Sequence, residues 1–296
     1  NNMGAMLSSM MNGSDLDQTD NNLDWFARLS IKTDNNTTWY LGAARKTRSA
    51  SYQERYLWLP LEATGGLADG KTYVGNPNLN PEVAHEIELG FDMDYGNLSF
   101  YPRLFYKEVS DFIQGTPATN MVVKNFAQMM SNMGMGRPDP LQFSNVDANF
   151  YGFDMEAHYR LSSRLNFRAV ASVVRGERDD INDDLYRISP DNLILALDYR
   201  GDNWTSSLES VTYADQNRVS ATNLEQKTDG YSIFNLTSSI NLSSDLEAVL
   251  GAENIFDEEY DDHLAAYNRA FNPDLAMRTR MPGLGRNYYA RLMWYF

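Results

Sequence analysis

Two short clusters of methionine carry the clearest candidate chemistry in the sequence. Thioether sulfur is a soft ligand that selects copper(I) over hard cations. The chain has no cysteine, so it offers no thiolate ligand and no disulfide. The spacing within each cluster lets several sulfurs converge on one ion. The candidate metal ligands are Met3, Met6, Met10, Met11, Met129, Met130, Met133 and Met135. Copper would be a transported ion, and we expect no bound cofactor.

The same methionines have a second interpretation. Eleven of the 14 methionines lie in segments that we expect to be long loops, including Met121, Met277 and Met281. A methionine in a loop that folds over an apolar surface can simply fill gaps, because its side chain is flexible and apolar. The sequence leaves copper contact and gap filling both open.

Histidine and acidic residues add one further candidate for metal contact. His263 lies beside Asp261 and Asp262 in the last long loop and could join a metal entry site, although a lone histidine is usually structural. The acidic runs 177–184 and 257–262 either attract cations or form solvated loop surface. The formal net charge of −15 excludes nucleic acid as a partner, because phosphate binding needs a basic surface.

Neither catalysis nor a helical membrane anchor is indicated. His85 lies at the start of an expected strand and His158 in the interior of another. No nucleophile is marked beside His158, so we expect no catalytic residues and no enzyme. No stretch approaches the roughly 18 consecutive apolar residues that a transmembrane helix needs. The 18 Tyr, 14 Phe and 5 Trp are typical of the aromatic girdles of a membrane barrel.

The segments between the loops alternate in polarity at every residue. In residues 286–296 the apolar face consists of Tyr288, Ala290, Leu292, Trp294 and Phe296, and the other face carries Arg291. Residues 83–95 repeat the pattern with four carboxylates on one side. A strand with lipid on one face and a polar lumen on the other needs this period of two. The predicted fold class is therefore all-β, a transmembrane antiparallel β-barrel.

Eleven such strands are predicted, and their connections fall into two alternating classes. The strands are expected near 24–33, 37–46, 83–95, 97–109, 147–161, 164–176, 191–200, 203–214, 231–242, 245–255 and 286–296. Five connections are tight turns, and the intervening ones are long, at 47–82, 110–146, 177–190, 215–230 and 256–285. Long loops are typically extracellular and short turns periplasmic. Residues 1–23 would then be the remnant of another extracellular loop, and the C-terminus would lie in the periplasm.

An odd number of strands cannot close a single-chain bacterial barrel, which has an even number. An open sheet would leave two unpaired edges in lipid. We therefore expect the N-terminal wall strands to belong to the native protein but to lie outside this chain, which would be the C-terminal part, 1–296, of one barrel.

Two motifs resemble those of TonB-dependent outer-membrane receptors. Residues 75–82, Gly-Asn-Pro-Asn-Leu-Asn-Pro-Glu, resemble the segment that enters a strand in that family. Residues 251–260, Gly-Ala-Glu-Asn-Ile-Phe-Asp-Glu-Glu-Tyr, together with 282–286, Pro-Gly-Leu-Gly-Arg, resemble its C-terminal region. Each motif also has a purely structural interpretation as a strand boundary.

The resemblance implies a 22-stranded barrel with an N-terminal plug domain and a TonB box, driven by the inner-membrane energy complex. Both the plug and the box are absent from these residues. The terminal Phe296 resembles the signal that the barrel insertion machinery recognises. Lipids of the bacterial outer membrane and the TonB complex would be further partners.

Residues 45–56 and 67–73 are similar to the copper-receptor branch of the family, which favours active copper uptake. Two alternatives stay open. A receptor for a ferric siderophore or another metal chelate would use aromatic and arginine loop residues such as Trp58, Tyr56 and Arg55. A passive porin would share the alternating wall but keep an open lumen.

Overall fold

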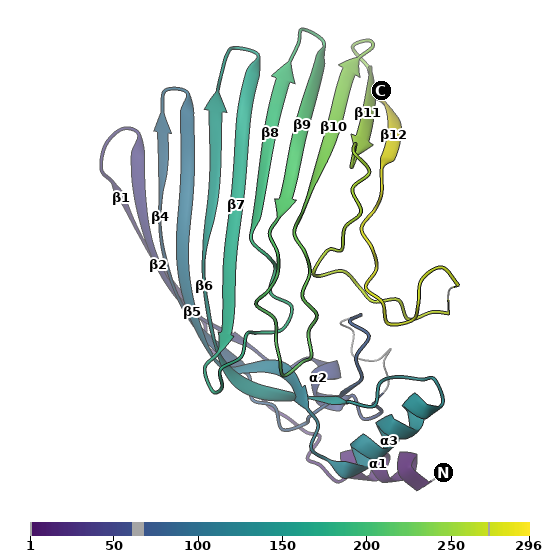
Figure 1. The fold of residues 1–296 in the computed structure, drawn as a ribbon. Coiled ribbons are helices and arrows are strands. Elements are labelled where there is room, and N and C mark those ends of the chain that lie inside the picture. Colours follow the sequence, from purple (N-terminus) through teal and green to yellow (C-terminus); the bar gives the residue numbers. More distant parts are fainter. Residues whose placement is uncertain (1, 61–67, 272) are drawn as a thin grey trace.

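The computed structural model describes residues 2–60, 68–271 and 273–296, and a single antiparallel wall dominates it. All eleven expected strands are present and pair with their sequence neighbours in one continuous path (Figure 1). They are β1 (Trp25–Lys32), β2 (Thr37–Arg48), β4 (Glu82–Tyr95), β5 (Leu98–Pro117), β6 (Leu141–Arg160), β7 (Leu165–Arg178), β8 (Asn192–Arg200), β9 (Trp204–Tyr213), β10 (Tyr231–Asn241), β11 (Leu246–Glu253) and β12 (Asn287–Trp294). We call this path the wall. β1 and β12 are its two edges.

The pairing register confirms that one face of the wall is apolar. Leu89 lies opposite Leu41 on one side and Leu104 on the other, and Leu104 lies opposite Phe153. These side chains stay exposed in the chain by itself, with Leu89 at 46% and Leu104 at 53%. A contiguous apolar surface of this kind needs an apolar solvent, and the hydrocarbon core of a bilayer supplies it.

The opposite face of the wall is polar. Arg103 on β5 forms an ion pair with Asp92 on β4, and Ser172 on β7 donates to Asp154 on β6 at 2.7 Å. Polar partners thus alternate with the apolar row along the same strands, as a lipid-facing and lumen-facing wall requires.

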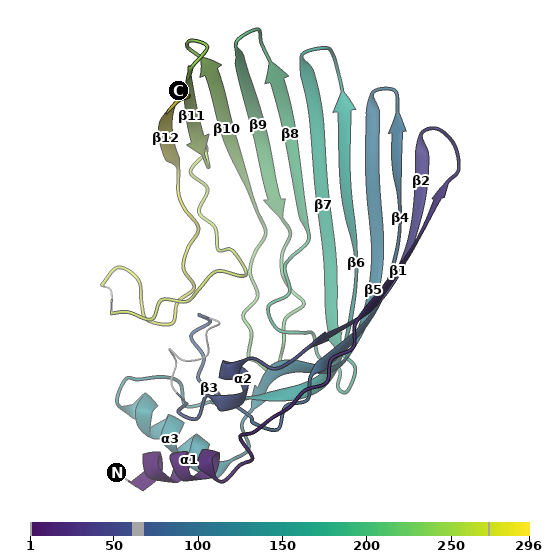
Figure 2. The ribbon, with the colours of Figure 1, turned by 180° about the vertical axis from the view of Figure 1, so that it is seen from behind.

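Tight turns and long connections lie at opposite ends of the wall. Figure 1 shows the short turns at the top beside the C-terminus, and the long connections with the helices at the bottom. Figure 2 shows the same curved sheet from behind, with the N-terminus again at the long-loop end. The predicted two-sided arrangement is therefore confirmed as topology.

At the long-loop end the connections build a second structured region, which we call the cap. It contains the helices α1 (Asn2–Asn12), α2 (Tyr52–Tyr56) and α3 (Met121–Asn132). The short strand β3 (Tyr73–Val74) pairs in parallel with the start of β6. Residues 1–23, 47–82 and 110–146 were expected to be loops, and the helices in all three are a correction. Among the described residues, no helix is long and apolar enough to cross a membrane.

Two strands run much further into the cap than the sequence pattern predicted. β5 was expected to end at 109 and β6 to begin at 147, but they pair as far as Pro117 and Leu141. The ladder shifts register between Val109 and Phe112, where Asp111 has a φ of 58°. A β-bulge of this kind puts the alternation out of phase, which explains why the pattern seemed to end there.

Two apolar clusters hold the cap together. The first contains Leu7 of α1, Val74 of β3 and Val123 and Phe126 of α3. The second contains Tyr73, Leu79, Ile113, Leu141 and Phe143. Within it the rings of Tyr73 and Phe143 stack with their centroids 5.1 Å apart. The cap is thus packed in the manner of a water-soluble domain, whereas the wall is not.

Candidate metal-capture site in the cap

The first methionine cluster lies on α1, on both sides of the buried Leu7. Met3 precedes Leu7 by four residues, so both lie on the helix face that packs toward α3. Met6 and Met10 are 45% and 39% exposed, and Met10 lines a groove together with Leu7 and Val123. Met11 is half-buried. One helix therefore presents methionines both to the apolar cluster and to solvent.

The second methionine cluster lies at the C-terminal end of α3 and in the turn that follows. Asn120 caps the helix by accepting the backbone N–H of Val122 at 2.8 Å. Met129 and Met130 pack against the first apolar cluster. Met133 and Met135 are 63% and 44% exposed. The helix thus repeats the division seen on α1.

Both clusters are brought together because α1 packs on α3. Met3, Met129 and Met130 fill space between the helices, whereas Met6, Met10, Met133 and Met135 are accessible. A groove of about 230 Å³ next to Met10 and Met11 is closed by Trp58 and the start of α3. We call the eight methionines of the two clusters, Met3, Met6, Met10, Met11, Met129, Met130, Met133 and Met135, the methionine surface.

His263 lies in a different junction of the cap. Its Nδ1 is 3.0 Å from the hydroxyl of Thr228, and its Nε2 is 3.1 Å from the carboxylate of Glu225. Its carbonyl oxygen accepts a hydrogen bond from Arg280. Both ring nitrogens are therefore engaged by the chain, and none of the methionines is among the partners of His263. In the described part of the chain no group of three or more His, Asp or Glu side chains is arranged to hold a metal.

A buried carboxylate that the sequence pattern did not mark links several cap segments. Asp69 is 3% exposed and accepts hydrogen bonds from the hydroxyls of Tyr73 at 2.6 Å and Tyr186 at 2.8 Å. Burial, followed by the charge of Asp69, raises the pKa of both phenols well above the usual value. Both tyrosines therefore stay protonated donors at any physiological pH.

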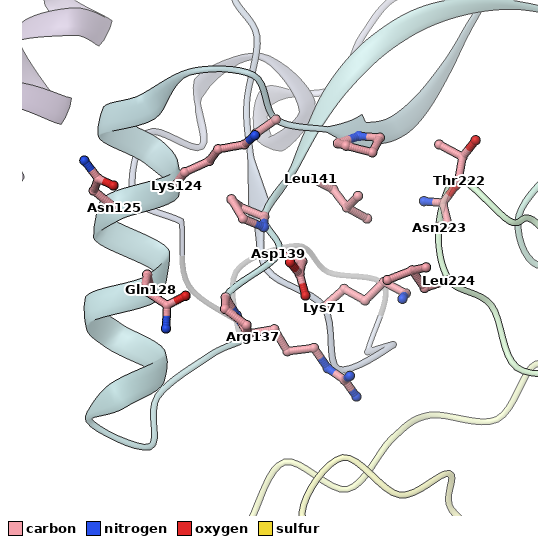
Figure 3. A pocket seen from close by; sticks show the side chains of 14 residues that line it. Lys71, Lys124, Asn125, Gln128, Arg137, Asp139, Leu141, Thr222, Asn223 and Leu224 are labelled. Atoms are coloured by element: carbon pink, nitrogen blue, oxygen red, sulfur yellow. The ribbon is translucent and has the colours of Figure 1, made fainter.

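Beside this carboxylate is a cavity of about 500 Å³, which we call the α3 pocket. Its walls come from α3, the turn after it, the segment before β3 and the turn at 222–224 (Figure 3). The charged residues that line it are Lys71, Lys124, Arg137 and Asp139. The sequence does not reveal this pocket, because its three cations are 53 and 13 residues apart along the chain.

The two sequence motifs prove to be attachment points of long connections. Gly75 donates to the carbonyl of Leu57 at 2.6 Å, and an added Cβ there would meet the backbone of Arg55. Asn254, 2% exposed with a φ of 47°, donates to the carbonyls of Glu258 at 2.8 Å and Leu284 at 3.1 Å. The first motif thus holds two cap segments together, and the second holds the start and the end of the last long connection together.

The description "TonB dependent receptor-like, beta-barrel" is that of a family model that matches residues 7–255. The chain belongs to this receptor family. Membership places the receptor wall in a bacterial outer membrane, in agreement with its apolar face. No curated protein matches the sequence significantly.

Solved structures share the receptor fold. The "Copper transporter OprC" is 21% identical with a TM-score of 0.73, covering 92% of this chain and 39% of that one. The siderophore receptor PirA from Pseudomonas aeruginosa is 17% identical with a TM-score of 0.61, covering 92% and 41%. The FrpB iron transporter from Neisseria meningitidis is 14% identical with a TM-score of 0.64, covering 93% and 39%. The chain thus spans about two fifths of the length of these proteins.

Proposed function

We propose that the chain belongs to an outer-membrane receptor that takes up a scarce metal, most specifically copper, by TonB-driven transport. The observation that carries the proposal is the methionine surface, in which two packed helices and the turn after α3 gather eight methionines at one end of the barrel, four of them exposed. Soft sulfur ligands of this kind favour copper(I). The likeness to a copper transporter supports the same cargo.

In this proposal the cap is extracellular and acts as a capture surface. The exposed Met6, Met10, Met133 and Met135 bind the ion reversibly. The half-buried methionines pack between α1 and α3 and keep the two helices together. The net charge of −15 raises the local concentration of cations. His263 does not take part, because its ring nitrogens are already bound.

The remaining partners follow from the wall. Each of the edge strands β1 and β12 has one neighbour in the sheet, so further strands of the same barrel would pair with them in lipid. The plug and the TonB complex would supply gating and energy. The insertion machinery would recognise the terminal strand through Phe296, with the C-terminus in the periplasm and residues 1–23 in an extracellular loop.

A receptor for a ferric siderophore or another metal chelate is the second candidate, favoured by the likeness to PirA and FrpB. A passive porin is a weaker candidate, because family membership favours a gated receptor. Planar-bilayer recording separates a gated receptor of either kind from a passive porin, since a gated receptor gives no large steady conductance.

The test measures copper(I) affinity of the purified receptor against a chromogenic copper(I) competitor. All eight residues of the methionine surface are changed to Leu, which removes sulfur but keeps volume and apolarity. We expect copper(I) binding to weaken at least tenfold, roughly 1.4 kcal/mol, with an unchanged melting temperature. Met121→Leu is the matched control, because Met121 is a 64% exposed methionine on α3 outside the surface.

The outcome also decides between the metals. Retained copper(I) affinity in the eightfold variant, or no copper(I) binding by the intact receptor, contradicts the copper proposal. Uptake of ferric chelates by the same preparation would then support the second candidate.

A further inference from the structure

We propose that the α3 pocket is a binding site for a small organic anion that carries carboxylate or phosphate groups. The cavity of about 500 Å³ collects cationic side chains from three separate segments. Lys71 comes from the segment before β3, Lys124 from α3, and Arg137 from the turn after α3. The inference goes beyond metal capture, since it concerns binding of an anion without metal.

The pocket collects positive charge in a chain that is negative overall. Several arginines outside it are held by carboxylates, as in the pairs of Arg48 with Glu82 and Arg103 with Asp92. Within the described ranges, the three cations of the pocket have no carboxylate within the 4.0 Å of an ion pair. Asp139 is the one acidic residue in the lining, which leaves two net positive charges in a protein of net charge −15.

The position of Arg137 leaves its terminal nitrogens for a ligand. Its backbone N–H donates to the hydroxyl of Thr72 at 2.9 Å, and its Nε donates to the carbonyl of Gly70 at 2.8 Å. These bonds fix the base of the side chain and do not use the Nη atoms. Figure 3 shows Lys71 and Arg137 extending into the same part of the cavity, with Lys124 on the side of α3. An anion between them would receive charge-assisted hydrogen bonds.

The surroundings of Lys71 favour binding of an anion, because its ammonium group is partly buried and the nearby carboxylate of Asp69 is already hydrogen-bonded to other groups. The ammonium lies 5.8 Å from the centre of the Tyr186 ring. Burial and then the nearby charge of Arg137 lower the pKa of Lys71, against the opposing charge of Asp69. Asp69 is occupied by two tyrosine hydroxyls and by the backbone N–H of Lys71. A bound anion would stabilise the protonated amine, so binding should weaken as rising pH removes this proton.

Neutral groups complete the lining and set the ligand class. Asn125, Gln128 and Thr222 provide hydrogen-bonding groups without adding charge. Leu141 and Leu224 provide apolar contact. Two net positive charges favour a ligand with at least two anionic groups over a monoanion.

The experiment is calorimetric titration of the full-length receptor in detergent, without metal, with citrate in one arm and pyrophosphate in the other. We expect saturable binding of at least one, and the two arms tell carboxylate from phosphate recognition. Lys71→Gln should weaken binding about tenfold. Asp139→Asn should strengthen it severalfold, because it removes the repelling carboxylate. Lys227→Gln is the matched control, since Lys227 is an exposed lysine outside the pocket.

Folding and the metal proposal are controlled separately. Each variant must keep the melting temperature of the parent receptor and its copper(I) affinity. The inference is overturned if neither anion binds the parent, if Lys227→Gln weakens binding as much as Lys71→Gln, or if Asp139→Asn weakens it. None of these outcomes bears on the methionine surface, whose own test uses copper(I) alone.

Discussion

The wall and the cap use apolar side chains in opposite ways. Leu104 in the wall is 53% exposed, whereas Leu7 and Tyr73 in the cap are 3% and 0% exposed. Lipid provides the apolar environment of the wall, so the position of each side chain there depends mainly on its own strand and its pairing register. The cap must exclude water by itself, so each residue depends on segments that are distant in sequence. The same chain therefore contains one region suited to lipid and another suited to water.

The largest predicted difference between the regions comes from truncating one apolar side chain in each. Tyr73→Ala should cost about 3–5 kcal/mol in the cap, because it opens a cavity against Phe143 and removes a donor to Asp69. Leu89→Ala in the wall should cost only about 1–2 kcal/mol, since lipid fills the space and only the lost transfer of the deleted carbon atoms remains. Limited proteolysis reports the cap, and heat-modifiable gel mobility reports the wall. Equal losses in both variants would break the contrast.

A smaller effect should come from an ion pair that attaches the segment between α1 and β1 to the rest of the cap. Arg55 is 5% exposed and donates to both carboxylate oxygens of Asp20 at 2.8 Å. Hydrogen bonding from Arg55 lowers the pKa of Asp20. A lowered folded-state pKa contributes stability above the unfolded value of about 3.9 and loses it as pH falls through the folded pKa.

Asp20→Asn should therefore cost about 1–3 kcal/mol at neutral pH, because it leaves the buried guanidinium without its counter-charge. Below the folded pKa of Asp20 the variant and the parent should be equally stable. Thermal melting from pH 7 down to pH 2 measures this convergence, which begins as pH falls below the unfolded value of about 3.9. A constant gap between the two curves would mean that Asp20 does not titrate with folding.

Effects of the same size or smaller should come from adding one methyl group at a glycine in each region. In the cap, the Cβ of Gly75→Ala would lie 2.6 Å from the carbonyl oxygen of Arg55, which is backbone and cannot swing aside. In the wall, the Cβ of Gly251→Ala would meet the ring of Tyr289, a side chain that can. We expect losses of about 1–3 and below about 1 kcal/mol. Thermal melting of both variants ranks them, and the reverse order would contradict this account.

The same contrast explains how much the sequence could predict. The wall strands follow from alternation, because a period of two is local and is repeated in every strand. The pattern failed where the bulge at Asp111 interrupts it, and the extension of β5 and β6 was missed. α3 had a usable signal, since Asn120 is a helix-capping residue followed by apolar residues at Val123, Phe126 and Ala127.

The candidate sites were less predictable, because their contacts are non-local. The sequence placed both methionine clusters in loops, but it could not show that α1 packs on α3. It suggested His263 as a metal ligand without indicating that Glu225 and Thr228 occupy both ring nitrogens. The α3 pocket combines Lys71, Lys124 and Arg137, whose separation in the chain gives no motif.

The bulged ladder of β5 and β6 separates what the barrel must keep from what it can change. Beyond Asp111 the two strands continue to pair up to Pro117 and Leu141, and α3 lies between these ends. Residues 118–140 could be lengthened, shortened or exchanged without moving a single pairing partner in the membrane, because the ladder fixes the register. The strand pair thus separates two kinds of sequence change, because the segment beyond it can vary in length and composition while the pairing in the membrane part stays the same.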